Sequence, residues 1–351
     1  MRLTRTEEKN KKLTKNNLQK AISLISEMGI VTIESVLSKS WCQKMNNAWL
    51  GVLDRGDTMR PSNEDTWKQL LDFPFIDPLA IENPWGIQII REVLGNNFWG
   101  FLPYHTNTNW PENKFTDDFL WVHRDQGQFF PELKIPQPPL WMIMNIPLID
   151  FTDKNGSTEV WPGSHHIIDP NPLEVRIGPI GKNMDHRVSR MPSKRLNVPA
   201  GSLIIRDMRL CHRATINKSK EPRCMLSFVY KSEKLGIDTW DGFGPFPNFN
   251  KFGPLPKFLK NKLSNNAQQI YRFVKYPKHI KPIFDQEALT KDEKKRINLI
   301  RVLSVLSNLG YDKTNADKGI KRLITLYKNQ NLDLAEAHPI ELVDKAVSLI
   351  K

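Results

Sequence analysis

The central part of the chain, residues 119–232, has the pattern that most restricts the fold. Short apolar or alternating runs follow one another there, among them Leu140–Ile149 and Cys224–Tyr230. Turn signals such as Asn155-Gly156 and Ala200-Gly201 separate them. Many short strands with Gly, Pro and Asn-Gly turns between them predict an antiparallel sandwich or barrel. We therefore expect a mainly β core in this part of the chain.

Helical patterns lie on both sides of this β region. Before it, apolar residues at helical spacing run from Leu18 to Met28 and end at Gly29, and Ser38 is placed to cap a second helix. After it, amphipathic periodicity and capping signals predict three helices, over 290–309, 314–328 and 339–350. The expected fold class is mainly β with flanking helices (α+β) and a C-terminal helical extension.

The charge is divided unevenly along the chain. The formal net charge of the 351 residues is +13; residues 1–20 hold +5 and residues 251–351 hold +10, so the part between them is close to neutral at −2. We expect a basic, flexible tail over 1–17, a β domain over 18–250 and a basic helical extension over 251–351. A basic composition often indicates a polyanionic partner, but such a contact would here be a property of the two ends.

Composition also indicates a compartment. No apolar run approaches the roughly 18 residues of a membrane span, and the charged first residues lack the apolar stretch of a secretory signal. The three cysteines, Cys42, Cys211 and Cys224, have no Cys-x-x-Cys spacing and are too few for a disulfide framework. We expect a cytoplasmic protein without a membrane span.

Two potential metal ligands stand two residues apart in Trp121-Val-His-Arg-Asp125. Side chains alternate along a strand, so His123 and Asp125 point the same way and can bind one ion. The candidate third ligand is His212, which ends a second strand-like run. Two imidazoles and one carboxylate on one face are typical of iron(II) sites with open positions for a co-substrate and oxygen. An isolated His-x-Asp also arises by chance, so the interpretation needs further support.

Arg223 supplies that support. It lies 11 residues beyond His212, after a polar turn and at the start of an apolar strand. A hairpin of this length returns the chain beside His212, and a guanidinium binds a carboxylate through two nitrogens. An arginine after a turn is by itself more often a surface residue. In combination with the His-x-Asp pair and the distal histidine, Arg223 favours a metal site with a carboxylate co-substrate.

These residues resemble the phytanoyl-CoA dioxygenase family of Fe(II)/2-oxoglutarate-dependent oxygenases. The segments Asn155–His165 and Gly201–His212 are similar to the turn and the distal-histidine strand of that family. The resemblance covers roughly residues 18–232 and implies a double-stranded β-helix, a cupin-like jelly roll. It implies that the mouth of this fold holds Fe(II) on His123, Asp125 and His212.

The resemblance also implies a reaction. Arg223 occupies the position of the arginine that binds the distal carboxylate of 2-oxoglutarate. Trp141 is similar to a tryptophan that lines the co-substrate pocket, although a packed strand aromatic is an equal alternative. Such an enzyme uses O2 to convert 2-oxoglutarate to succinate and CO2 and hydroxylates a small-molecule substrate. The carboxylate of Asp125 favours hydroxylation over halogenation, because related halogenases carry a small residue there.

The substrate is less well specified. Arg124 and Arg213, each next to a candidate ligand, suggest an anionic small molecule, and salt bridges that support the metal strands are the alternative. Residues 240–260, rich in Gly, Pro and Phe, are either a linker or a lid. Neither the substrate's identity nor the oligomeric state follows from the sequence.

Two other function classes stay open. One is a non-catalytic jelly-roll binding module whose basic ends engage a polyanion or a protein partner. The other is a cupin-like isomerase or ring-opening dioxygenase, which would share the fold without needing Arg223. Nucleic acid is not the expected partner, because the basic ends carry neither interleaved aromatics nor a helix-turn-helix or zinc motif.

Overall fold

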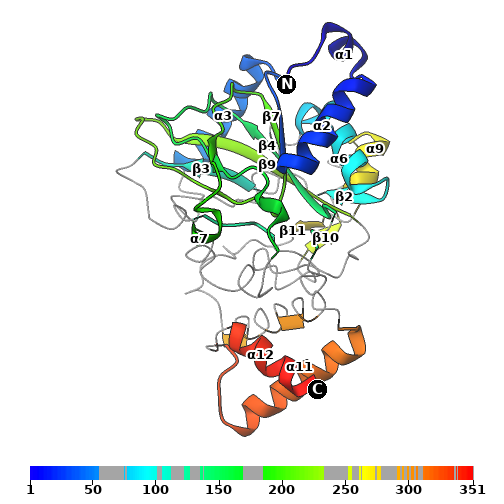
Figure 1. The fold of residues 1–351 in the computed structure, drawn as a ribbon, viewed down its shortest axis with the longest axis vertical. Helices are drawn as coiled ribbons and strands as arrows, with labels where there is room; N and C mark the ends of the chain where they lie inside the picture. The colour runs from blue at the N-terminus through cyan, green and yellow to red at the C-terminus, as the bar shows by residue number, and fades with distance from the viewer. Residues whose placement is uncertain are drawn as a thin grey trace.

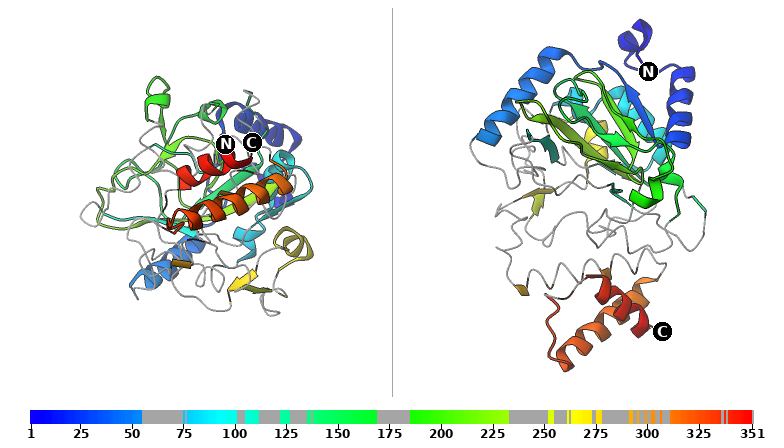
Figure 2. Two further views of the ribbon diagram at one scale, coloured as in Figure 1. Left: turned by 90° about the horizontal axis from the view of Figure 1, so that it is seen from below. Right: turned by 60° about the vertical axis from the view of Figure 1, so that its left-hand side comes forward.

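The chain folds around a main antiparallel sheet that has helices on one side and a small second sheet on the other (Figures 1 and 2). The computed structural model describes residues 1–54, 75, 77–100, 105–111, 122–126, 135–136, 138–168, 185–232, 252–254, 261, 263–272, 275–277, 291–292, 295, 299, 302–303, 306, 311–335, 337 and 339–350.

The main sheet has the order β1-β7-β4-β9-β2, and β3 also pairs with β9. All of these pairs are antiparallel, and the first residues of β9 face β3 while its last residues face β2. The strands are β1 (Ile30–Ile33), β2 (Phe98–Gly100), β3 (His105–Asn109), β4 (Trp141–Pro147), β7 (Leu203–Asp207) and β9 (Arg223–Ser232). The small sheet has the order β6-β5-β8, formed by β5 (Glu159–Val160), β6 (Lys194–Arg195) and β8 (His212–Arg213).

Helices cover one face of the main sheet, as the right-hand view of Figure 2 shows. They are α2 (Lys15–Met28), α3 (Lys39–Asp54), α5 (Pro78–Ile81), α6 (Pro84–Leu94) and α9 (Asn265–Ile270). The cap of α6 is Asn83, whose side chain accepts from the Gly86 amide. A Cβ on Gly86 would lie 2.5 Å from Met144 Sδ, so α6 rests directly on β4.

The other face of the main sheet looks toward the small sheet, and we call it the inner face. Leu203 and Ile205 of β7 pack among the helices, so the alternate residues Ile204 and Arg206 point the opposite way. Ile204 shares a core cluster with Val160 of β5, which places the small sheet over the inner face. The two sheets form a sandwich. The main sheet has an apolar face toward the helices, and its inner face bounds the space between the sheets.

Residues 1–17, predicted as a flexible tail, include a short helix. α1 (Arg5–Asn10) begins with a capping box between Thr4 and Glu7. The fully buried Glu7 carboxylate also accepts from the amide and hydroxyl of Thr14, and Leu13 belongs to the main core. One buried carboxylate thus organises this polar sequence, which composition does not reveal, and the flexibility of residues 1–17 stays a prediction.

Part of the segment after residue 251, where the sequence predicts the start of the extension, packs on the main core. Ala267 and Ile270 of α9 pack in the main core, and the Tyr271 hydroxyl donates to the carbonyl of Ile81. Residues 263–271 therefore belong with the β domain. The predicted linker or lid at 240–260 lies outside the described residues except for β10 (Phe252–Pro254), which pairs with β11 (Lys275–Pro277).

The last part of the chain has a core of its own. α11 (Lys313–Asn329) and α12 (Pro339–Ile350) fall where the sequence predicts helices, at the red end of the colour scale in Figure 1. Their apolar residues cluster with Val302 and Leu306, inside the predicted helix at 290–309. Short helical turns elsewhere are η4 (Ser164–His166) and α7 (Asp185–Val188). None of the helices within the described ranges has the length and apolar character needed to cross a bilayer.

Candidate metal centre

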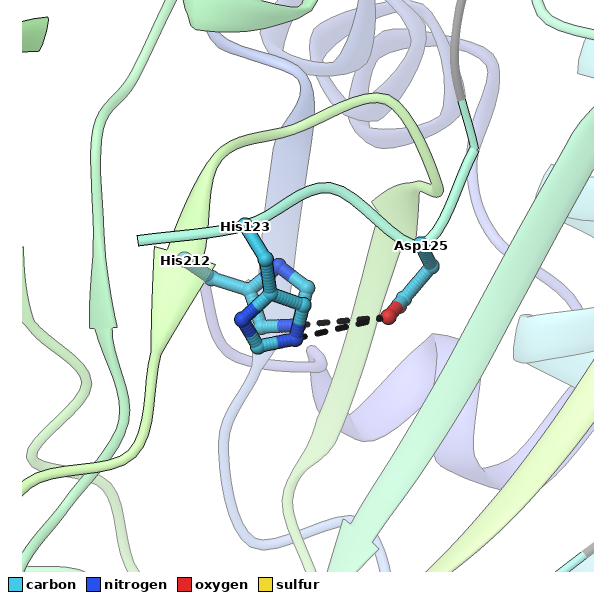
Figure 3. A group of neighbouring side chains, drawn as sticks. All are labelled: His123, Asp125 and His212. Atoms are coloured by element: carbon cyan, nitrogen blue, oxygen red, sulfur yellow. Dashed lines mark ion pairs between the residues drawn. The ribbon is translucent and has the colours of Figure 1, made fainter. Parts of the chain in front are cut away.

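The fold brings His123, Asp125 and His212 together (Figure 3). Asp125 Oδ1 lies 3.7 Å from His123 Nε2 and 3.5 Å from His212 Nε2. Bonds of about 2.1 Å to one metal ion put neighbouring ligand atoms about 3 Å apart in an octahedral site, so a contraction of roughly half an ångström completes the geometry. The two nitrogens and one oxygen are a donor set that suits iron(II).

Backbone pairing positions the two histidines. The amide of each donates to the carbonyl of the other at 2.9 Å, so His123 extends the small sheet beside β8. The turn between β7 and His212 is closed by Arg209, whose amide and guanidinium both donate to the Asp207 carboxylate. The Gln126 amide donates to the Met208 carbonyl in that turn. The three candidate ligands are therefore fixed by main-chain contacts as well as by packing.

The electrostatics favour the ligand forms of Asp125 and His212. Burial by itself would raise the pKa of Asp125, but Arg206 and the two histidines hold that pKa well below its usual value. Burial, and then the charge of Arg206, lower the pKa of His212 well below 6.5. Asp125 is thus ionised and His212 neutral near pH 7, as metal coordination requires.

Arg206 is a site residue that the sequence analysis does not single out. Its Nη2 donates to Asp125 Oδ2 and lies 3.3 Å from His212 Nε2. Its Nη1 is buried without a hydrogen-bond partner among the described residues. The sequence does contain a signal for this residue, because Arg206 is a cation directly after the apolar residues Leu203–Ile205. Its neighbours in the structure follow only from strand pairing.

Arg223 begins β9 on the inner face. Cys224 and Leu226 pack on the helix side, so Arg223 points to the same interior as Arg206. It is 3% exposed, and its guanidinium carbon lies 4.3 Å from the centre of the Phe151 ring. Its Nε and Nη1 are buried with no hydrogen-bond partner in the described part of the chain. Burial lowers the pKa of Arg223 to about 10, so the guanidinium is charged near neutral pH and available to a carboxylate.

The inner face between Arg223 and the triad is polar. Asn145 Nδ2 donates to Ser227 Oγ, and that hydroxyl donates to Asn107 Oδ1, both at 2.7 Å. Such a chain across three strands is unusual in a purely structural core, which prefers apolar residues. It provides polar walls for a charged or polar ligand.

Trp141 lies at the end of the inner face near the triad. Its carbonyl accepts from the Met208 amide, one residue beyond β7, and its strand partner is Lys231. The Lys231 ammonium is buried 5.0 Å from the Trp141 ring and 5.9 Å from the Trp99 ring. Lys231 is a second inner-face cation that the sequence analysis does not identify.

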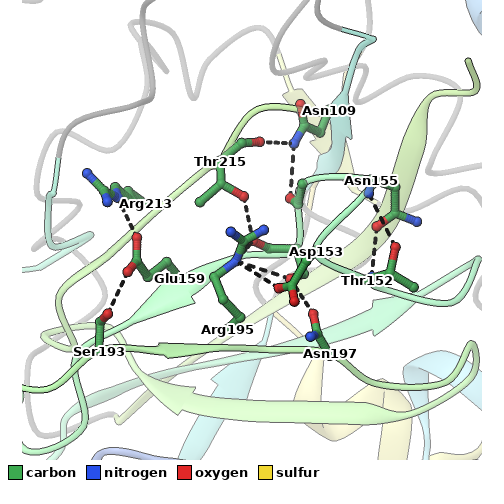
Figure 4. Close-up of polar contacts among 12 residues, drawn as sticks. Asn109, Thr152, Asp153, Asn155, Glu159, Ser193, Arg195, Asn197, Arg213 and Thr215 are labelled. Atoms are coloured by element: carbon green, nitrogen blue, oxygen red, sulfur yellow. Dashed lines mark hydrogen bonds and ion pairs between the residues drawn. The ribbon is translucent and has the colours of Figure 1, made fainter. Parts of the chain in front are cut away.

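Arg124 and Arg213 point away from the triad. Each directly follows a candidate ligand on extended chain, so its side chain takes the opposite face. Arg124 Nη2 donates to the carbonyls of Ser164 and Ile167 and thereby holds η4. Arg213 Nε donates to Glu159 Oε2 at 2.6 Å, on the outer side of the small sheet (Figure 4). The fold does not bring these two guanidiniums to the metal centre.

Comparison with known proteins agrees with this arrangement. The sequence profile of the family described as "Phytanoyl-CoA dioxygenase (PhyH)" matches residues 86–225, which include the triad and Arg223. Two crystal structures of the epimerase SnoN have similar folds, with TM-scores of 0.50 and identities of 19% and 18%. Each match covers 62% of this chain, and 85% and 84% of the two SnoN chains. They confirm the predicted jelly-roll fold, and residues 86–225 are similar to the phytanoyl-CoA dioxygenase family.

Proposed function

We propose that the protein is an Fe(II)- and 2-oxoglutarate-dependent dioxygenase that hydroxylates a small-molecule substrate and releases succinate and CO2. The family match and the His-Asp-His cluster support this class of enzyme. One of the SnoN structures is described as a complex with Fe3+ and alpha ketoglutarate, which supports the same pair of groups here.

The side chains fit these two groups. His123, Asp125 and His212 would hold the iron through Nε2, Oδ1 and Nε2, and the bound metal with its oxo acid would supply the chemistry that activates O2. Arg223 would bind the far carboxylate, and Trp141 would line the pocket. The protein's own part is to orient the ligands and to keep water from the interior.

The observation that carries the proposal is that Nε and Nη1 of the buried Arg223 have no acceptor among the described residues, on the inner face that also reaches the triad. A buried cation is costly unless a counter-charge binds to it.

The proposed anionic character of the substrate now rests on Lys231, because Arg124 and Arg213 do not face the triad. Lys231 and its two tryptophans lie at the end of the inner face near Asp125, where a substrate would meet the metal centre. We also propose a cytoplasmic location, which the three buried, unpaired cysteines support.

The test is anaerobic addition of Fe(II) and 2-oxoglutarate, followed by visible absorption. We expect a charge-transfer band that His123→Ala abolishes. Arg223→Gln should weaken 2-oxoglutarate binding by roughly tenfold to a hundredfold, the value of a charge-assisted hydrogen bond. Arg91→Gln, on α6 across the sheet, is the matched control and should leave the band unchanged.

Two outcomes would contradict the proposal. Absence of a band in the wild-type protein would favour a non-catalytic binding module. A band that depends on the triad but is unchanged in Arg223→Gln would contradict the role proposed for Arg223. Succinate release with candidate substrates then identifies the reaction.

A further inference from the structure

Arg206 occupies a position that a structural salt bridge does not explain. Its side chain is almost entirely buried, and Nη2 contacts Asp125 Oδ2 and His212 Nε2 at once. The guanidinium therefore lies beside the atoms that would bind the metal. Nη1, on the other branch of the guanidinium, is buried and has no acceptor among the residues that the structure describes.

The contact with His212 cannot persist when a metal is bound. His212 Nδ1 lies 2.9 Å from the Leu210 carbonyl, an acceptor only, so Nδ1 carries the proton and Nε2 has the lone pair. A metal on Nε2 takes that lone pair from Arg206. The contact with Asp125 Oδ2 can remain, because Oδ1 is the oxygen that faces the two histidines.

The positive charges of Arg206 and of a bound metal ion together favour an anion in the same site. A guanidinium next to a divalent cation is repelled by it, and the repulsion is strong in a buried site. A carboxylate placed on the metal lies between the two cations and attracts both. The free Nη1 donor supplies the hydrogen bond that such a carboxylate accepts.

We propose that Arg206 is a positioning residue that couples the metal to the oxo acid: it orients Asp125 through Oδ2 and binds, through Nη1, the carboxylate next to the keto group. This inference rests on the proposed function and assigns the two carboxylates of 2-oxoglutarate to two arginines. Arg223 takes the far carboxylate, and Arg206 takes the near one.

Pyruvate separates the two roles, because it has the keto acid end of 2-oxoglutarate but lacks the far carboxylate. The experiment measures Mn(II) affinity by the loss of the free Mn(II) electron paramagnetic resonance signal, without oxygen or turnover. Each protein is titrated alone, with 2-oxoglutarate and with pyruvate. The proteins are the wild type, Arg206→Gln, Arg206→Lys and Arg223→Gln, each checked for folding by its thermal melt.

We expect both oxo acids to tighten Mn(II) binding to the wild type. In Arg206→Gln the tightening by both should fall by roughly tenfold to a hundredfold, the loss of a charge-assisted hydrogen bond. Its affinity for Mn(II) alone should change little, because loss of the Asp125 contact and relief of repulsion oppose each other. Arg206→Lys keeps the charge but not the two-nitrogen fork, so part of the tightening should return. In Arg223→Gln the tightening by 2-oxoglutarate should fall toward that by pyruvate, and the tightening by pyruvate should stay as in the wild type.

If both oxo acids raise the Mn(II) affinity of Arg206→Gln as much as that of the wild type, the inference is overturned. A loss of affinity for Mn(II) alone, with the tightening unchanged, would also overturn it, because Arg206 would then only support Asp125. A wild-type protein that shows no tightening by 2-oxoglutarate would contradict the proposed function itself, and this result is visible before any variant is compared.

Discussion

Two aspartates of this chain, the buried Asp207 and the partly buried Asp125, are paired with arginine in different ways. Asp207 receives Arg209 through the Nε and Nη2 atoms and also accepts the Arg209 amide, so its two oxygens are both occupied. Asp125 receives a single nitrogen of Arg206 on Oδ2, which leaves Oδ1 toward the histidines. The first pair is closed and shapes a turn, whereas the second leaves one oxygen to coordinate a metal.

The closed pair carries a prediction about stability. Arg209→Ala leaves the Asp207 carboxylate buried without its partner, which costs about 3–5 kcal/mol of the free energy of unfolding. Urea unfolding followed by circular dichroism measures this loss. The double variant Asp207→Ala/Arg209→Ala removes the unpaired charge and should recover part of it. A loss below about 1 kcal/mol in the single variant would contradict a structural role for this pair.

At the residue scale, the sequence points to the triad and Arg223 because their spacing and order are local signals, and the fold brings the three triad residues together. Alternation on extended chain could also have excluded Arg124 and Arg213, since a residue next to a ligand faces the other way. Arg206 and Lys231 could not be placed in advance. Their neighbours, Asp125 and Trp141, come from strand pairing between distant parts of the chain.

At the scale of the elements, the position of α1 depends on the hydrogen bonds of one carboxylate, that of Glu7. Glu7 accepts from the Thr4 amide as well as from Thr14 and Asn17, and it joins α1 to the start of α2. Burial alone would raise the pKa of Glu7, but these hydrogen bonds outweigh it and lower the pKa to about 2.

This pKa gives a prediction for acid unfolding. A carboxyl whose folded pKa is depressed stabilises the protein above its unfolded pKa, here 4.5, and loses that contribution as the pH falls toward 2. Allowing for solvent screening, the contribution is about 1–2 kcal/mol. Glu7→Gln should therefore be less stable than the wild type at pH 6, with the gap closing below pH 4 in thermal melts. A gap independent of pH would contradict this assignment.

Elements with local end signals are predicted accurately. α2 ends at Gly29 and α3 begins after Ser38, as their capping residues indicate. β7 is shorter than the predicted strand because the Asp207–Arg209 pair turns the chain after Asp207. The two-residue strands of the small sheet have no signal of their own, since pairing between distant segments creates them.

For the whole molecule, two hydrophobic clusters share no member among the described residues. One joins the main sheet to its helices, and the other joins α11 and α12 to Val302 and Leu306. We propose that the C-terminal helices unfold as a separate unit. The sequence anticipates this unit through its helical periodicity and its charge, but not the attachment of α9 to the main core.

Calorimetry of the full chain tests the proposal. Leu323→Ala, in α11, should lower the midpoint temperature of only one of two unfolding transitions. The free energy of unfolding of that unit should fall by about 2–5 kcal/mol. The matched variant Leu226→Ala, in β9, should lower only the other. A single transition that both variants shift equally would show one cooperative unit.

β9 links the chemistry of this protein to its folding. Its odd-numbered residues from Arg223 to Lys231 face the interior, and its even-numbered residues from Cys224 to Tyr230 belong to the apolar core. One inserted residue inside β9 would exchange the two sets and place cations among the helices. The connection from 214 to 222 tolerates such a change far better, because a loop absorbs extra length without reversing any face. An insertion is therefore better tolerated in the connections, while the core behind β9 fixes the length of the strand that carries the proposed co-substrate contacts.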